Sequence, residues 1–122
     1  MEFVYFNANP SGETMPDCVT RAISLALNIP YYEVISLLRE NGIFYECNCL
    51  CVSCYEKLLD ERFKLDHHYV EGQVKTVEDI IKEHPNDILL IRVNGHLTCG
   101  MYGKSYDIFN CTNEIVTDYW VC

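Results

Sequence analysis

Two side chains in this sequence could form a reactive thiol–imidazole pair, Cys18 and His96. Cys18 follows Asp17, and apolar residues recur after it at helical spacing until Asn28 and Pro30. This pattern predicts a helix with Asp17 as its N-cap and Cys18 in its first turn. There, unpaired backbone N–H groups and the helix dipole favour a thiolate over a thiol, as a nucleophilic cysteine requires. The alternative is a small buried residue in a helix that happens to contain cysteine.

The histidine follows Asn94-Gly95, a pair typical of tight hairpin turns. A two- or four-residue loop around Gly103 would bring Asp107 of the returning strand to the face of His96, whereas a three-residue loop would bury Asp107 and bring Asn110 there instead. Burying an unpaired carboxylate costs several kcal/mol, so we expect Asp107 to hold the imidazole, with Asn110 as second choice. The alternative for His96 is a polar residue at a strand end that faces water.

The elements that must position these residues occur in an α+β order, with helices first and an antiparallel sheet after them. Asn41-Gly42 is a typical helix end, and Ser53 with Glu56 has the form of a capping box, which would place Cys54 in a first turn as well. A second capping pattern begins at Thr76. The periodicity predicts helices over about 18–27, 30–42, 53–63 and 76–84, an extended connection over 64–70, and strands over 3–6, 88–93, 96–102, 105–110 and 115–121.

Composition indicates one globular domain spanning residues 1–122, with 49% hydrophobic and 22% charged residues. No signal peptide or membrane span is recognisable, because the longest apolar run, 88–91, is short. We therefore expect a cytoplasmic protein without a membrane partner. The net charge of −9 argues against a nucleic-acid partner; the excess acid could attract a basic partner or keep the protein soluble. The oligomeric state is not indicated.

Four of the eight cysteines form a cluster, Cys47-x-Cys49-x-Cys51-x-x-Cys54, with His67-His68 downstream. These are ligand types for zinc or an iron–sulfur cluster, but zinc sites usually have two well-separated ligand pairs rather than four crowded ligands. Without a secretory signal, free thiols in a reducing compartment are expected. We expect no bound metal and no cofactor.

A set of short motifs spans nearly the whole chain: Asn9-Pro10, Asp17-Cys18-Val19-Thr20-Arg21-Ala22, Gly95-His96-Leu97, Gly103, Tyr106-Asp107 and Tyr119-Trp120. In these motifs the chain resembles the short papain-like cysteine peptidases encoded by phages, prophages and Gram-positive bacteria. More distantly, it is similar to the peptidases that cleave double-glycine leaders of bacteriocins. Two departures from the family pattern are Ile108-Phe109-Asn110 in place of Thr-Trp-Asp, and the cysteine-rich segment 46–54.

The resemblance implies a papain-like fold, with N-terminal helices packed on a C-terminal antiparallel sheet, and a thiol hydrolase that acts on a protein or peptide substrate. Cys18 would be the nucleophile, His96 the general base and acid, and Asp107 the residue that orients His96. For the oxyanion, the Cys18 N–H would be one donor and a side-chain amide from Asn9 or Asn7 the other. Related peptidases often have Gln six residues before the cysteine, where this chain has Gly.

Two alternatives remain open for the function. The same three residues could carry out acyl transfer, since the sequence does not distinguish water from another acceptor. The chain could also be a catalytically idle interaction protein with a papain-like shell, such as a phage factor that binds a host protein.

Overall fold

The computed structural model describes residues 1–122 and has an α+β architecture with four helices and one six-stranded mixed sheet. A short π-helical segment, η1, directly continues the third helix. The elements in chain order are β1 (Glu2–Tyr5), α1 (Cys18–Leu27), α2 (Tyr31–Tyr45), α3 (Val52–Lys57), η1 (Leu58–Arg62), β2 (Asp66–Tyr69), α4 (Val77–Glu83), β3 (Ile88–Val93), β4 (His96–Met101), β5 (Lys104–Asp107) and β6 (Val116–Val121).

The sheet has the strand order β1-β5-β4-β3-β6-β2. Its four central strands are the predicted C-terminal ones, and they pair antiparallel. The prediction of a purely C-terminal, antiparallel sheet is wrong at both edges. β1 joins β5 in parallel, and β2 forms within the predicted extended connection and pairs with β6. The sequence pattern of one strand does not identify its neighbour, because edge pairings depend on which sheet edge the rest of the fold leaves open.

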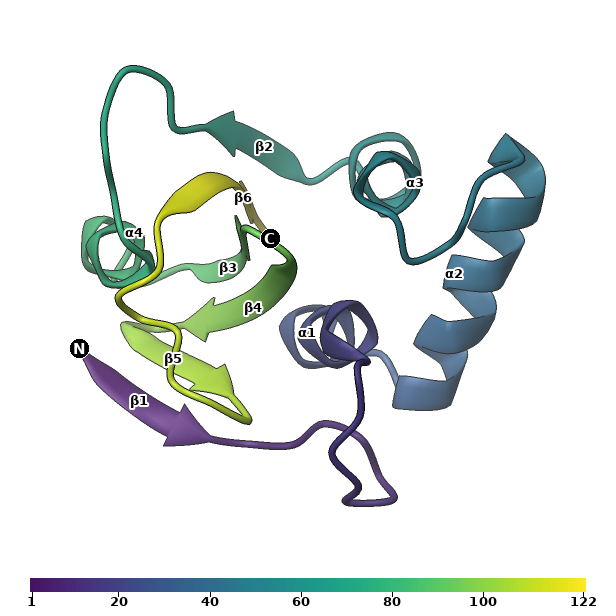
Figure 1. Ribbon diagram of the computed structural model, residues 1–122, viewed down its shortest axis with the longest axis horizontal. Helices are drawn as coiled ribbons and strands as arrows, with labels where there is room; N and C mark the ends of the chain where they lie inside the picture. Colours follow the sequence, from purple (N-terminus) through teal and green to yellow (C-terminus); the bar gives the residue numbers. More distant parts are fainter.

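The helices lie on both faces of the sheet, so β3 and β4 are covered twice (Figure 1). α1 packs on β3 and β4, α2 lies outside α1, and α3 packs against α2. α3 also reaches the sheet, since Glu56 pairs with Arg92 of β3 at 3.0 Å and the Tyr55 ring lies beside Trp120 of β6. α4 covers the opposite face, where Gly100 leaves room for Ile81: a Cβ on this glycine would lie 3.0 Å from Cγ1 of Ile81. The apolar run in β3 follows from this double covering, since Leu90 faces the α1 side whereas Leu89 and Ile91 face α4.

Two predicted helix boundaries were wrong. α2 continues through Asn41-Gly42 to Tyr45, because both residues serve packing rather than termination. The buried Asn41 amide donates to the carbonyl of Cys54 at 2.9 Å. A Cβ on Gly42 would lie 2.9 Å from the carbonyl oxygen of Cys47. At the start of α3 the N-cap is Cys51 and no capping box forms, whereas the capping box predicted at Thr76 is present with Asp79.

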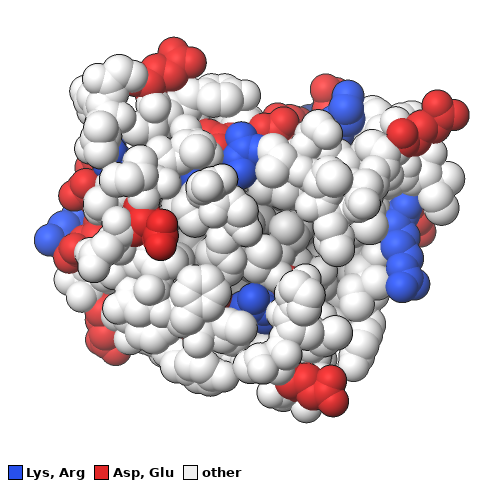
Figure 2. All heavy atoms as spheres, viewed as in Figure 1, with Lys and Arg blue, Asp and Glu red and all other residues white.

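On the face seen in Figure 2, acidic and basic side chains are interspersed around a largely uncharged centre. None of the helices is long and apolar enough to span a membrane.

Candidate functional site

Cys18 is the first residue of α1, and its thiol is partly exposed. Asp17 occupies the N-cap position as predicted, but its side chain makes no capping bond to the helix. The first-turn N–H groups of α1 therefore have no side-chain acceptor from the cap. Hydrogen bonding from the backbone of Leu97 in β4 favours the thiolate form of Cys18 and lowers its pKa.

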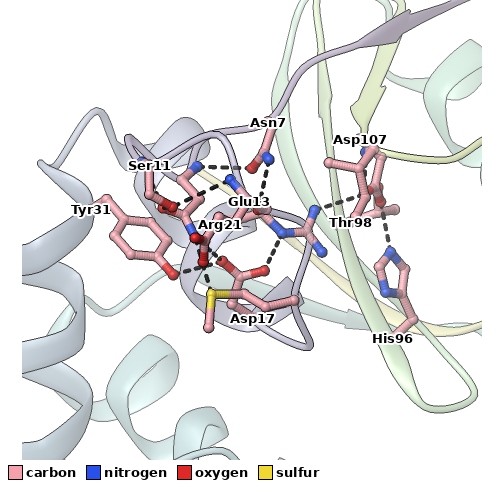
Figure 3. A network of polar contacts seen from close by, with 12 residues as sticks. Asn7, Ser11, Glu13, Asp17, Arg21, Tyr31, His96, Thr98 and Asp107 are labelled. Atoms are coloured by element: carbon pink, nitrogen blue, oxygen red, sulfur yellow. Dashed lines mark hydrogen bonds and ion pairs between the residues drawn. The ribbon is translucent and has the colours of Figure 1, made fainter.

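His96 begins β4 and is held by Asp107 at the end of β5. Nε2–H of His96 donates to Oδ2 of Asp107 at 2.6 Å, which leaves Nδ1 as the nitrogen available to Cys18 (Figure 3). The turn between the strands is Tyr102-Gly103, since Met101 pairs with Lys104. This is the two-residue loop that places Asp107 on the His96 face.

The alternative register, with Asn110 beside His96, is wrong. Asn110 lies beyond β5, and its Oδ1 accepts from the backbone N–H of Thr112 at 3.0 Å and from its hydroxyl at 2.6 Å. His96 does not face open water either, because its side chain is only 11% exposed.

The carboxylate of Asp107 is almost fully buried, and each of its oxygens has two strong donors. Oδ2 accepts from His96 and from the Thr98 hydroxyl at 2.7 Å. Oδ1 accepts from Nη1 of Arg21 at 3.0 Å and from the backbone N–H of Ile108 at 2.7 Å. Such saturation fixes the carboxylate and, through it, the plane of the imidazole.

The electrostatics of the site favour a thiolate–imidazolium pair. Burial alone would raise the pKa of Cys18, but hydrogen bonding from His96 and Leu97, with the charges of His96 and Arg21, outweighs it and lowers the pKa. Burial would lower the pKa of His96, but the hydrogen bond to Asp107 and the neighbouring thiols raise it to about 11. Burial likewise opposes ionisation of Asp107, yet donation from His96 and Thr98 lowers its pKa.

A cleft of about 390 Å³ opens beside Cys18 and His96. A second hollow of about 140 Å³ adjoins it and shares Cys18, His96 and Leu50. The larger cleft is walled mainly by apolar side chains, and Arg92 and Tyr55 line the smaller one. The volume of the larger cleft lies within the range of small-molecule binding sites. The apolar wall of the larger cleft consists of Met15, Pro16, Val19, Leu50, Ile108 and Phe109.

The structure does not support Asn9 as the oxyanion donor. Its amide nitrogen donates to Oδ2 of Asp17 and to the sulfur of Met15, both at 3.2 Å, and its Oδ1 accepts from Ser11. Asn9 is 4% exposed, so both amide hydrogens are committed inside the protein. The amide of Asn7 is also occupied, since it donates to the carbonyl of Glu13.

The expectation of free thiols in the cysteine cluster is wrong for two of its members. Cys47 and Cys54 form a disulfide, because α2 and α3 bring their Cα atoms to 5.7 Å. This removes Cys54 as a rival nucleophile, and its sulfur is buried. Cys49 and Cys51 are free thiols, and Leu50 between them lines the cleft beside Cys18. The cytoplasmic location stays a prediction.

Two groups of side chains have metal-ligating atoms close together: His96, Asp107 and Cys111, and Glu56, His67 and Asp118. In each group an arginine already binds the central aspartate, Arg21 in the first and Arg92 in the second. A bound cation would meet that positive charge at short range, so neither group fits a metal.

Sequence reasoning missed four residues of the site network. Arg21 could have been found as the i+4 partner of Asp17. Thr98 follows His96 by two residues and so shares its face. Tyr31, whose hydroxyl donates to Asp17 at 2.6 Å, and Cys111, buried beside Asp107, carried no signal because both come from outside the motifs.

Comparisons with known protein families, with curated proteins and with solved structures find no match for this chain. The likeness to papain-like peptidases therefore rests on the sequence motifs.

Proposed function

We propose that this chain is a thiol hydrolase of papain-like type that cleaves peptide or isopeptide bonds through Cys18, His96 and Asp107. The observation that carries the proposal is the meeting of a helix-opening, partly exposed Cys18 with a histidine whose other ring nitrogen is held by a buried aspartate at 2.6 Å. This is the arrangement that activates a thiol and returns a proton to a leaving group.

In the first half of the reaction, the Cys18 thiolate attacks the substrate carbonyl carbon. The carbonyl π electrons move to oxygen, which faces the N–H groups of the first turn of α1. His96 then gives its Nδ1 proton to the leaving nitrogen, the carbon–nitrogen bond breaks, and an acyl thioester on Cys18 remains. Asp107 keeps the proton on Nε2, so that only Nδ1 exchanges protons with the reacting groups.

In the second half, neutral His96 takes a proton from water through Nδ1 as the water oxygen attacks the thioester. Collapse of that intermediate releases the carboxylic acid and regenerates the thiolate–imidazolium pair. An amine or hydroxyl acceptor in place of water would give acyl transfer by the same steps.

The apolar wall of the larger cleft supports a peptide substrate with a large aliphatic or aromatic side chain close to the scissile bond. The first test is therefore a library of internally quenched peptides with such residues, incubated with wild-type protein and with Cys18→Ala. Intact-mass analysis after brief acidification would detect an acyl group on Cys18.

The expected result is cleavage that requires Cys18 and His96, with a trapped acyl adduct. Limited alkylation with iodoacetamide near pH 6 gives an assay that needs no substrate. Cys18 should label before the exposed Cys51 and Cys122, because its pKa is lowered whereas that of Cys122 is raised to about 11. Labelling of Cys51 first, with Cys18 unreactive, would refute the assignment and favour the interaction-protein alternative.

A further inference from the structure

Arg21 lies inside the candidate active site, where none of the proposed catalytic steps uses it. Its side chain is 7% exposed. Nε donates to Oδ1 of Asp17 at 2.6 Å, and Nη1 donates to Oδ1 of Asp107 at 3.0 Å. Asp17 directly precedes Cys18, and Asp107 holds His96. One guanidinium thus joins the start of the helix that carries the thiol to the strand that orients the imidazole (Figure 3).

We propose that Arg21 is the positioning residue of this site: by bridging Asp17 and Asp107, it fixes Cys18 against His96 and supplies positive charge beside the thiolate. The inference rests on the proposed function and adds to it the residue that aligns its two reacting side chains.

The anchoring of Asp17 supports this role. Its carboxylate leaves its own helix uncapped and instead accepts from Arg21, from the Tyr31 hydroxyl at 2.6 Å and from the Asn9 amide at 3.2 Å. Three donors from the N-terminal loop, α1 and α2 therefore meet on one carboxylate. Because the Asp17 carboxylate binds these three donors instead of capping its own helix, it fixes the position of the first turn of α1 and therefore of Cys18.

The two carboxylate oxygens of Asp107 have different partners. Oδ1 is occupied by Arg21 and the Ile108 N–H, and this turns Oδ2 toward His96 and Thr98. The planar guanidinium fork can hold two carboxylates at once, which an ammonium group does not reproduce. Without Arg21, Asp17 and Asp107 would be two buried carboxylates that lack their shared counter-ion.

The charged and titratable groups around Cys18 and Arg21 come from both sides of α1. They are Asp17 and Arg21 at the start of α1, Tyr31 of α2, Tyr55 of α3, Arg92 of β3, His96 of β4 and Asp107 of β5, with Cys111 beside His96. Removing Arg21 from this set takes away a positive charge and leaves the carboxylate of Asp17, the residue before Cys18, without its ion pair. Both changes disfavour the thiolate, so the acid limb of Cys18 reactivity should move to higher pH.

The test is the pH profile of Cys18 alkylation by iodoacetamide in the full chain, for wild type, Arg21→Gln and Arg21→Lys. Arg39→Gln is the matched control, since Arg39 is an exposed arginine on α2. For Arg21→Gln we expect the acid limb to rise by about one pH unit and the rate near pH 6 to fall about tenfold. For Arg21→Lys we expect the limb to stay near its wild-type position while the plateau rate falls, because the charge is kept and the fork is lost. Arg39→Gln should match wild type.

A purely structural role would lower the melting temperature of both Arg21 variants without moving the limb or the plateau, and that result would overturn the inference. Failure of both variants to fold would assign Arg21 to the fold and would overturn it too. If Arg21→Gln alone fails to fold, the plateau rate of Arg21→Lys decides the question. His96→Gln separates the two proposals. If Cys18 of the wild type is alkylated with the pH profile of an ordinary thiol, and His96→Gln does not change that profile, the proposed function is refuted. If the acid limb of the wild-type profile lies at low pH, and His96→Gln shifts it while Arg21→Gln does not, only the role of Arg21 is refuted.

Discussion

Replacing Asp107 by Asn changes one charge at the centre of the site while keeping the shape of the side chain. Asp107 accepts from four donors, and an amide can accept only through its one oxygen. If that oxygen stays with Arg21 and Ile108, the amide nitrogen faces His96 and repels its Nε2–H. The imidazole then loses its charged partner and favours the tautomer with the proton on Nδ1.

The size of the effect follows from the bond that is lost. A hydrogen bond to a charged group contributes about 1.5–3 kcal/mol. At about 1.4 kcal/mol per factor of ten, its loss lowers the thiolate–imidazolium population by roughly 10- to 150-fold. We therefore expect Cys18 alkylation near pH 7, and any peptide cleavage, to fall by that factor. The free energy of unfolding should fall by about 1–3 kcal/mol, which a domain of this size tolerates.

The chain contains a matched control at Asp118. This carboxylate is also buried, and it accepts from Arg92 at 2.5 and 2.7 Å and from His67. Asp118→Asn should therefore lower stability by a similar amount and leave the alkylation rate of Cys18 within about twofold of wild type. Asn110→Ala should change neither greatly, because Asn110 contacts only its own turn.

The comparison measures alkylation rates by peptide mapping and unfolding by urea titration on the same samples. Equal rates for Asp107→Asn and wild type would refute the role of Asp107. Slowing by Asp118→Asn as great as that by Asp107→Asn would mean that lost stability, and not the His96 contact, controls reactivity.

Three further outcomes are expected. The stability difference between wild type and Asp107→Asn should be largest between about pH 4 and 6.5. The lowered pKa of Asp107 stabilises the fold above the unfolded pKa near 3.9, and this stabilisation is lost as pH falls through the folded pKa. The raised pKa of His96 stabilises the fold fully below about pH 6.5, and this stabilisation is lost as pH rises through about 11. Urea titrations at about pH 3, 5 and 9 measure this, and a difference that does not vary with pH would contradict it. Denatured, unreduced protein should titrate six thiols and reduced protein two more, and reduction of the Cys47–Cys54 bond should cost about 2–3 kcal/mol of unfolding free energy; eight thiols without reductant would show that the bond is absent. Asn9→Ala should lower stability by about 1–2 kcal/mol through Asp17 but slow turnover much less than the 10²-fold or more typical of an oxyanion donor, and a loss of that size would restore the original assignment.

Local sequence patterns predicted the parts of the fold and site that depend on local geometry. The helix of Cys18, the capping box at Thr76 and the hairpin register of Asp107 all follow from periodicities of 3.6 or 2 and from turn residues. The two-residue loop was favoured over the three-residue loop because burying an unpaired carboxylate is costly. In the structure Asp107 is buried, but it is paired with His96, Thr98 and Arg21.

Patterns failed where a residue serves a distant partner. Gly42 looked like a helix end, yet it allows the cysteine loop to approach α2 closely. Asp17 looked like a cap, yet its carboxylate binds Arg21 and Tyr31. Cys47 and Cys54 gave no pairing signal, because only the packing of α2 on α3 sets their separation. Apart from the Asp17–Arg21 pair, whose i,i+4 spacing could have indicated it, these features depend on how separate elements pack together.

The parallel pairing of β1 with β5 has a consequence for how this protein can be made. The backbone N–H of Phe6 donates to the carbonyl of Asp107 at 2.9 Å, so the strand that carries the aspartate pairs with a segment that precedes it by nearly the length of the domain. During synthesis, at roughly 5–20 residues per second, β1 has no strand partner until β5 has emerged from the ribosome. Cys18 likewise emerges before His96 and Asp107, so its thiol is not activated until those two residues have been made. Any activity of Cys18 would begin only once the sheet closes.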